Sequence, residues 1–249
     1  MYIKGMKNCQ RCILSKSRTH ILQGEGSRSA KIMLIAQAPG EVEDSLGKMF
    51  IGPSGKVLDA VLKAAGIRRK DIYITNLLKC MLPKNRRPKQ AEIQSCAPFL
   101  EQEIKRIQPL VISPLGYYPT KYIFEKFKLE NFSKSEYPQT IAKIRHMDDV
   151  MIYPLTHPTS IIHHKEFFVG SVKNYARLIE MVQCKWYPLC PIKRFTDSGE
   201  LDGKWVRKYC KGNWQNCVRY QLEEAGIPHA DELLPDASTM SMRESRTPG

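Results

Sequence analysis

The sequence lacks the features that would place it in several common classes of protein. No apolar run approaches the ~20 residues that a membrane-spanning helix needs, and the first residues lack the apolar centre of a signal peptide. Gly52–Lys56 resembles part of a phosphate-binding P-loop, but the full spacing is missing and Val57 replaces the metal-binding hydroxyl. We therefore expect a cytoplasmic protein that neither spans a membrane nor binds ATP.

Acidic residues are scarce relative to basic ones. The 249-residue chain has 39 Lys and Arg against 25 Asp and Glu, a formal net charge of +14. Residues 1–183 hold 29 of these basic residues against 16 acidic ones, whereas residues 184–249 hold 10 against 9. Neutralisation of phosphates by Lys and Arg is a main source of affinity for nucleic acids. The charge therefore favours a nucleic-acid ligand for the first 183 residues over a basic protein without one.

The eight cysteines fall into two groups of four. Disulfides are rare inside cells, so metal ligands or reduced thiols are expected. Zinc and a four-iron cluster both accept four thiolates, and the spacing alone leaves both open. The second group has looser spacing, so a second metal centre (iron–sulfur or zinc) and the absence of one both stay open. The first group is Cys9, Cys12, Cys80 and Cys96; the second is Cys184, Cys190, Cys210 and Cys217.

Strand-like and helix-like patterns alternate along the first 183 residues. Such alternation predicts an α/β fold, a parallel sheet with helices on both faces in three α/β/α layers. The apolar runs that predict strands are Lys31–Ala36, Asp71–Leu77, Leu110–Leu115 and Val150–Leu155. The helix-like segments are Ser54–Ala65, Ala91–Ile107, Tyr118–Phe127 and His164–Met181.

The pattern changes after residue 183. We expect a domain over 1–183, a small cysteine-rich module over 184–235 with no clear strand, and a disordered polar tail over 236–249. A module of this size needs a staple such as a metal in order to fold.

Three of the predicted strands run into segments rich in polar and turn-forming residues. These segments are Ala36–Gly40, Thr75–Cys80 and Thr156–Ser160. Ligand crevices in open α/β sheets lie at the carboxyl ends of the strands. Together with Met49-Phe50, the segments supply turn backbone, an amide, an aromatic ring and a histidine. They predict a pocket for a flat polar heterocycle, such as a nucleobase.

The order of these motifs resembles the iron–sulfur uracil-DNA glycosylases, family 4 of the uracil-DNA glycosylase superfamily. The resemblance covers roughly residues 5–182 and rests on Ala36–Asp44 followed by Gly47–Gly55, on Thr75–Pro88 and on His157–Ile162. It implies a monofunctional hydrolase of base-excision repair that removes uracil from DNA and leaves an abasic site. It also implies a monomer, associated with the nucleoid, that carries a [4Fe–4S] cluster on Cys9, Cys12, Cys80 and Cys96.

The resemblance assigns roles in the pocket. An enzyme must flip uracil out of the duplex to reach it. The Asn76 amide offers a donor and an acceptor to uracil O4 and N3, Phe50 stacks on the base, and His157 donates to O2, where negative charge develops. The alternatives are a local turn bond for Asn76, core packing for Phe50 and a structural role for His157. Asn85 is placed near the pocket on resemblance alone.

Five residues are expected to contact the DNA. Ile161 stands where the family has an inserting leucine, and Ile162 lies beside it; core packing is the alternative for both. Lys84, Arg86 and Arg87 crowd the loop after Cys80 and are expected to contact phosphates.

Two pocket positions depart from the family. Gln37 replaces the usual Glu and can orient a water but cannot act as a base, and Ala38 stands where some other uracil glycosylases carry an activating Asp. A mechanism driven by leaving-group stabilisation tolerates both changes, because a cationic sugar needs only a weak, well-placed nucleophile. Gln37 joins His157 and Asn76 as a catalytic candidate, and Ala38 lies in the base-binding set.

Two other hypotheses remain beside a uracil glycosylase. One is an iron–sulfur nucleic-acid-binding protein of the same fold without activity. The other is a glycosylase for another deaminated base, such as hypoxanthine. The C-terminal module has three candidate roles: to extend DNA contact, to recruit a repair protein or to stabilise the fold.

Overall fold

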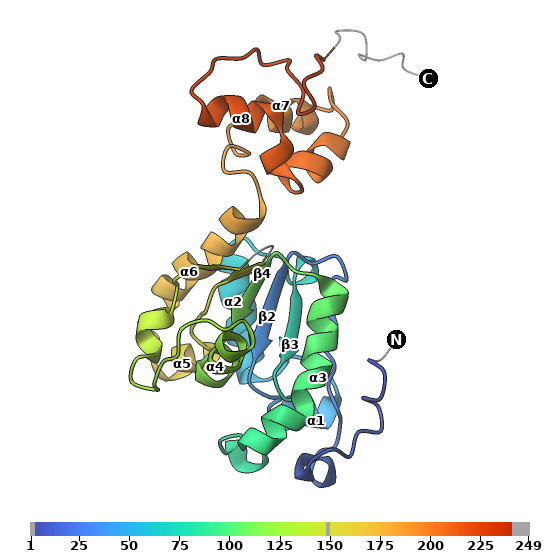
Figure 1. Cartoon of the computed structure of the whole chain (residues 1–249), viewed down its shortest axis with the longest axis vertical. Coiled ribbons are helices and arrows are strands. Elements are labelled where there is room, and N and C mark those ends of the chain that lie inside the picture. Colours follow the sequence, from blue (N-terminus) through green and yellow to red (C-terminus); the bar gives the residue numbers. More distant parts are fainter. Residues whose placement is uncertain (1–2, 148–149, 241–249) are drawn as a thin grey trace. The chain divides into compact units, whose positions relative to one another are not determined.

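The computed structural model describes residues 3–147 and 150–240. The chain forms two compact units, Met1–Leu178 and Ile179–Gly249, each with a core of its own (Figure 1). The boundary predicted from the sequence, after residue 183, lies a few residues beyond the boundary between these two units, which follows Leu178. No helix in the described ranges combines the length and the apolarity that spanning a membrane requires.

The first unit is built on a sheet whose described strands run in the order β1-β3-β2-β4-β6-β5. The four inner strands are parallel, and β1 and β5 pair antiparallel at the two edges. The four predicted strands are present, but the sheet is mixed rather than purely parallel. The strands are β1 (Glu25–Gly26), β2 (Ile32–Ala36), β3 (Tyr73–Asn76), β4 (Val111–Pro114), β5 (Arg145–Met147) and β6 (Val150–Ile152).

The register of the sheet brings the carboxyl ends of the inner strands to one edge. Ala36 at the end of β2 pairs with Asn76 at the end of β3, and Ile35 pairs with Pro114 at the end of β4. Leu155, which follows β6, forms an isolated bridge with Leu115. The loops that leave these strands therefore start side by side.

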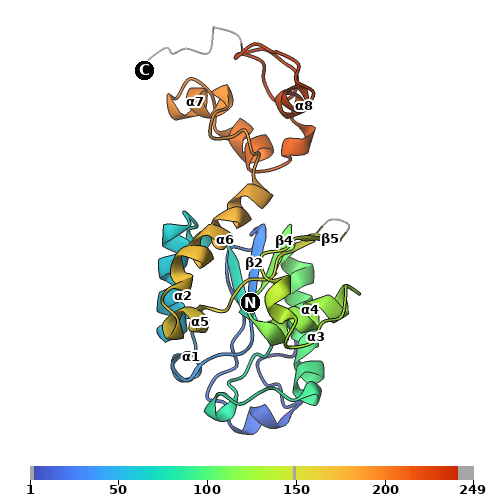
Figure 2. The same cartoon turned by 90° about the vertical axis from the view of Figure 1, so that its left-hand side faces the viewer.

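Helices cover both faces of the sheet, which accounts for the buried residues throughout β2, β3 and β4. In Figure 2, α2, α5 and α6 lie on one side of the sheet and α3 and α4 on the other. The helices of this unit are α1 (Glu41–Leu46), α2 (Pro53–Ala64), α3 (Gln90–Ile107), α4 (Tyr117–Lys126), α5 (Pro158–His163) and α6 (Phe167–Val182). Short 3₁₀ turns are η1 (Ile13–Lys16), η2 (Arg69–Asp71), η3 (Pro83–Asn85) and η4 (Tyr137–Thr140).

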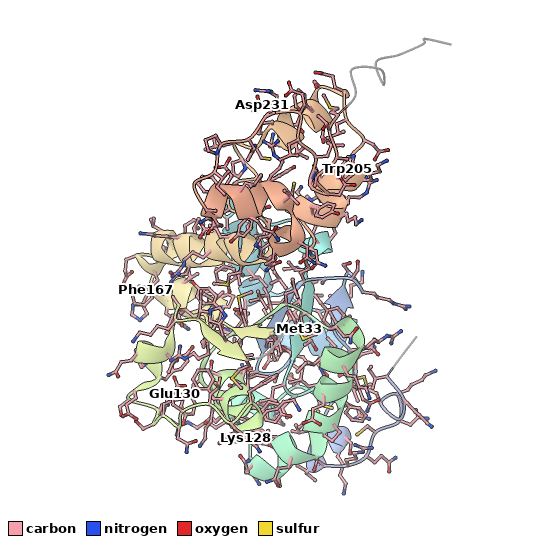
Figure 3. The ribbon with its side chains drawn as sticks, turned by 45° about the horizontal axis from the view of Figure 1, so that its top comes forward. Met33, Lys128, Glu130, Phe167, Trp205 and Asp231 are labelled. Carbon is pink, nitrogen blue, oxygen red and sulfur yellow. The ribbon has the colours of Figure 1, made fainter. Side chains whose placement is uncertain are left out.

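The core under α3 and α4 follows from the alternation of side chains along β2. Met33 and Ile35 are fully buried and pack with Phe99 of α3 and Phe124 of α4. Met33 lies in the interior of the ribbon in Figure 3, while Lys128 is exposed at the surface. This core also contains two of the cysteines, which fixes the sulfur site described below.

The second unit is small and helical. Its elements are α7 (Pro191–Asp197), the π-helical turn η5 (Val206–Cys210), η6 (Trp214–Asn216) and α8 (Val218–Glu224). As expected, its described residues contain no named strand, only a bridge between Leu233 and Thr239. Part of the predicted disordered tail is folded back by a hydrogen bond from Met240 N–H to Glu232 O at 2.8 Å. The rest of that tail, 241–249, lies outside the described residues.

Candidate functional site

A cleft of about 830 Å³ opens at the carboxyl edge of the sheet. Its walls come from the loops after β2, β3, β4 and β6, as the register of these strands requires. The size lies within the ~300–1,000 Å³ range of small-molecule sites. The structure brings together in this cleft all the residues that the sequence assigned to base binding: Gln37, Ala38, Phe50, Asn76, Asn85 and His157.

Asn76 presents an unsatisfied acceptor to the cleft. The side chain is buried, with 2% of its surface exposed, and its Nδ2 lies 3.5 Å from Met49 Sδ. Its Oδ1 is buried and has no hydrogen-bond partner among the described residues. A buried acceptor without a donor costs about 1–3 kcal/mol. A ligand N–H in the cleft would remove that cost.

The backbone around Asn76 is held from behind by Lys79. The Lys79 ammonium donates to Asn76 O and to Thr75 Oγ1, each at 2.7 Å, and to Glu103 Oε2 at 2.6 Å. Lys79 and Glu103 are both fully buried. The amide of Asn76 is therefore anchored through its main chain, while its Oδ1 stays free for a ligand.

The ring of His157 is a neutral donor. His157 caps the start of α5, where its Nδ1 accepts the Thr159 N–H at 3.1 Å. Burial lowers the pKa of His157 to about 4, so the ring is uncharged near neutral pH. With Nδ1 acting as acceptor, the proton of the neutral ring resides on Nε2. The site thus contains an N–H donor with no charge.

A tight turn fixes Phe50 in the wall of the cleft. Its φ of 51° lies in the left-handed region, and its ring centroid is 6.4 Å from that of His157. Arg69 donates to the carbonyl oxygens of Met49 and Phe50 at 2.5 and 3.0 Å. A Cβ on Gly55 would lie 2.0 Å from Phe50 O, so only glycine fits beneath this turn. Phe50 is 6% exposed, so it lines the cleft while most of its surface is packed.

Gln37 and Ala38 bring no carboxylate to the cleft. The Gln37 carbonyl accepts the Leu78 N–H at 2.9 Å, which fixes the backbone of this loop. The nearby Glu43 accepts the N–H groups of Ile51 and Gly52 at 2.9 and 2.7 Å. Glu43 is thus committed to holding a turn.

The basic residues in the loop after Cys80 differ in whether they are paired with a carboxylate. Lys84 and Arg87 are exposed, and Lys84 and Asn85 both have a φ of 53°. Arg86 instead makes two bonds to the Glu92 carboxylate, at 2.5 and 2.9 Å. Arg86 is therefore anchored to α3, whereas Lys84 and Arg87 present their charges to solvent.

The two isoleucines expected to act as a wedge differ in burial. Ile161 is 5% exposed and packs inside, while Ile162 exposes 38% of its surface. Of the two, only Ile162 offers an exposed apolar side chain.

The first group of cysteines gathers beside the core of the first unit. Cys80 and Cys96 belong to that core, and Cys9 and Cys12 pack against it. Arg18 donates to Cys80 Sγ at 3.3 Å, and the Lys79 N–H donates to Cys96 Sγ at 3.2 Å. Burial raises the pKa of Cys96 to about 12, with Cys80 and Cys12 near enough to add to the rise.

The chemistry of these sulfurs suits a metal centre. Four thiols are a donor set that both an iron–sulfur cluster and a structural zinc accept, and N–H groups donate to two of them. In the described ranges, no three His, Cys, Asp or Glu side chains stand in an arrangement that could hold a metal ion.

The second group of cysteines lines a separate cavity of about 60 Å³ in the second unit. The sequence placed these four together, and the structure does bring them to one cavity.

Sequence reasoning missed three structural residues of the site, Lys79, Glu103 and Arg69. From the sequence, Lys79 would be expected to face solvent, yet its side chain is fully buried. Glu103 carries a usable signal, because it shares the buried face of α3 with Cys96 and Phe99. Arg69 gives no signal, since its contact with the Phe50 turn spans 19 residues and depends on the fold.

Comparison with known proteins agrees with this geometry. The model of the Uracil DNA glycosylase superfamily matches residues 23–183. A type-4 uracil-DNA glycosylase of Sulfurisphaera tokodaii is 37% identical over 206 residues, which are 79% of this chain and 87% of the relative. One from Saccharolobus solfataricus is 38% identical over 186 residues, 72% of this chain and 84% of the relative. One from Archaeoglobus fulgidus is 33% identical over 180 residues, 72% of this chain and 90% of the relative. The chain therefore belongs to the uracil-DNA glycosylase superfamily, alongside its type-4 members.

Proposed function

We propose that this protein removes uracil from DNA in base-excision repair. It takes a flipped deoxyuridine into the cleft and hydrolyses the bond between uracil N1 and the sugar C1′, which leaves an abasic site. The observation that carries the proposal is the pairing of two unused groups in one cleft: the orphaned Asn76 Oδ1 and the Nε2–H of a neutral His157.

Asn76 reads the pairing edge of uracil. Uracil N3–H donates to Oδ1, which otherwise lacks a partner. The amide nitrogen carries two protons, so one can stay near Met49 Sδ while the other donates to uracil O4. Phe50 supports the face of the ring, and its turn is fixed by Arg69.

His157 stabilises the leaving group. As the C1′–N1 bond breaks, its electron pair moves to uracil, and negative charge develops at O2. A fixed donor at such a position typically contributes about 3–4 kcal/mol. The hydrogen bond from the neutral His157 ring to O2 becomes stronger as negative charge grows on O2.

Water completes the reaction at the cationic sugar. Its oxygen bonds to C1′, and its proton is released to solvent. Gln37 lines the cleft where this water would lie, and its amide can orient the water without removing the proton. Because bond breaking runs ahead of attack, no carboxylate base is required at residues 37 and 38.

Lys84 and Arg87 contact DNA phosphates, and Asn85 lies beside them at the cleft. Ile162 fills the gap that the flipped base leaves in the stack. Ile161 supports Ile162 from inside. Arg86 joins this surface while paired with Glu92, so its share of phosphate binding is smaller.

The first group of cysteines would hold a [4Fe–4S] cluster. Cys9, Cys12, Cys80 and Cys96 are the ligands, and the donors from Arg18 and the Lys79 N–H stabilise the thiolate charge. When bound, the cluster supplies a structural cross-link between the N-terminal segment, the end of β3 and α3.

The same proposal includes a monomer that works in the cytoplasm on nucleoid DNA. The positive charge of residues 1–183 supports the contact with DNA. The near-neutral second unit is assigned to a repair-protein partner rather than to phosphate.

The test is base release from a labelled oligonucleotide with one uracil, scored as strand cleavage after alkali. A matched oligonucleotide with hypoxanthine tests the alternative base. His157→Ala is expected to lower uracil release by ~10²–10³-fold. His164→Ala, an exposed histidine just beyond the same helix, is the control and should match the unmodified protein. Release of hypoxanthine but not uracil, or full activity in His157→Ala, would overturn the proposal.

A further inference from the structure

We propose that the second unit binds an iron–sulfur cluster of its own, held by Cys184, Cys190, Cys210 and Cys217. This inference does not depend on the proposed glycosylase activity. It rests on the way in which four separate segments bring their sulfurs to one cavity.

The four cysteines come from different elements. Cys184 follows α6, Cys190 immediately precedes α7, Cys210 ends η5 and Cys217 immediately precedes α8. All four line the same cavity, and the Cys184 N–H donates to Cys210 O at 2.7 Å. None of the eight cysteines of the chain forms a disulfide. The fold of this unit thus converges on its thiols.

The size of the cavity favours a cluster over zinc. A tetrahedral zinc bonds each sulfur at ~2.3 Å, which requires the four sulfurs to crowd around one point. The cavity that the four cysteines line measures about 60 Å³, several times the ~10–15 Å³ that one water needs. That space suits a group of several atoms better than a single ion.

The unit also needs such a cross-link. Its buried apolar core consists of Ile192, Leu201, Val206, Cys210 and Leu234. Cores of this size rarely hold a small domain together without a metal or a disulfide. Cluster binding would replace the four S–H bonds with S–Fe bonds, release the protons to solvent and tie α6, α7, η5 and α8 together.

Iron, acid-labile sulfide and zinc are to be counted per chain in the full-length protein, purified anaerobically and reconstituted with ferrous iron and sulfide. The double variant Cys184→Ser/Cys217→Ser removes two ligands of the second group, and Cys9→Ser/Cys12→Ser is its counterpart in the first. We expect the first variant to lose roughly a third to a half of the iron, as two or four irons leave with it, and the second to keep a cluster signal.

The iron, sulfide and zinc content of the unmodified chain tests the inference even if a variant does not fold. More than four irons with matching sulfide and no zinc supports the inference. Four irons with one zinc, or four irons with no other metal, overturns it. Reduction followed by electron paramagnetic resonance adds a second measurement: two cluster signals support the inference, and a single signal of the first group contradicts it.

Discussion

Lys79 Nζ lies 2.6 Å from Glu103 Oε2, and both side chains are fully buried. The same lysine holds the Asn76 carbonyl, and its own N–H donates to the Cys96 sulfur. One residue therefore connects the base-reading amide, the α3 helix and the sulfur site. The pair is a positioning device, since neither side chain lines the cleft.

Glu103→Gln is expected to destabilise the first unit by ~3–5 kcal/mol, because it leaves the Lys79 ammonium buried without a counter-charge. The control is Glu101→Gln on the same helix, whose carboxylate forms an exposed pair with Lys126 and should cost less than about 1 kcal/mol. Urea unfolding of both variants makes the measurement. Equal stability of the two would show that the buried pair is not needed.

Gly55→Ala is expected to displace the Phe50 turn, because the new Cβ would meet Phe50 O at 2.0 Å. A displacement of this kind costs on the order of 10²-fold in kcat/KM for uracil release. Gly170→Ala is the matched control, since a Cβ there meets nothing within 4 Å in the described residues. Unchanged kcat/KM in Gly55→Ala would remove Phe50 from the account of base binding.

The low pKa of His157 makes stability depend on pH. Its folded pKa of about 4 lies below the ordinary value of 6.5, so the unfolded chain takes up the proton first as the pH falls. The free energy of unfolding should therefore decrease between about pH 6.5 and pH 4 and level off below, by up to ~3 kcal/mol from this group.

His157→Gln removes that titration, and His164→Gln is the exposed control. Urea unfolding at several pH values should show a shallower acid slope in the first variant alone. Identical slopes in all three proteins would mean that His157 is not held neutral by burial.

The basic loop should divide into two kinds of residue. Lys84→Ala is expected to reduce the salt dependence of DNA binding by ~0.9 in the slope of log K against log salt, the value for one phosphate contact. Arg86→Ala should instead lower stability, because it strands the Glu92 carboxylate, which is 4% exposed. Binding titrations at several salt concentrations, with urea unfolding, separate the two. A larger salt effect in Arg86→Ala than in Lys84→Ala would reverse the assignment.

Much of this architecture can be predicted from sequence because the inner strands are continuous apolar runs bounded by turns. Ile32–Ala36 is one such run, and the helix after Gly52 shows regular apolar spacing. The edge strands β1 and β5 escape prediction because they have two and three residues, none of them buried. Their antiparallel pairing depends on neighbours that local patterns do not specify.

Gln37, Asn76 and His157 are predictable because they end or follow strands, and parallel strands share one end. The packing and pairing of the residues around them cannot be predicted in this way. Nothing local distinguishes Ile161 from Ile162 in a six-residue helix, although packing buries one and exposes the other. Likewise, Arg86 belongs to a charge run in the sequence, and only the fold gives it Glu92 as a partner.

The central claim is that Asn76 reads uracil through an acceptor and a donor on one amide. The most direct test is single-turnover release of uracil from a single-stranded oligonucleotide by the unmodified protein and by Asn76→Asp. The carboxylate has no N–H for uracil O4, so the account predicts a loss of ~10²-fold or more. Uracil release at an unchanged rate in Asn76→Asp would contradict it.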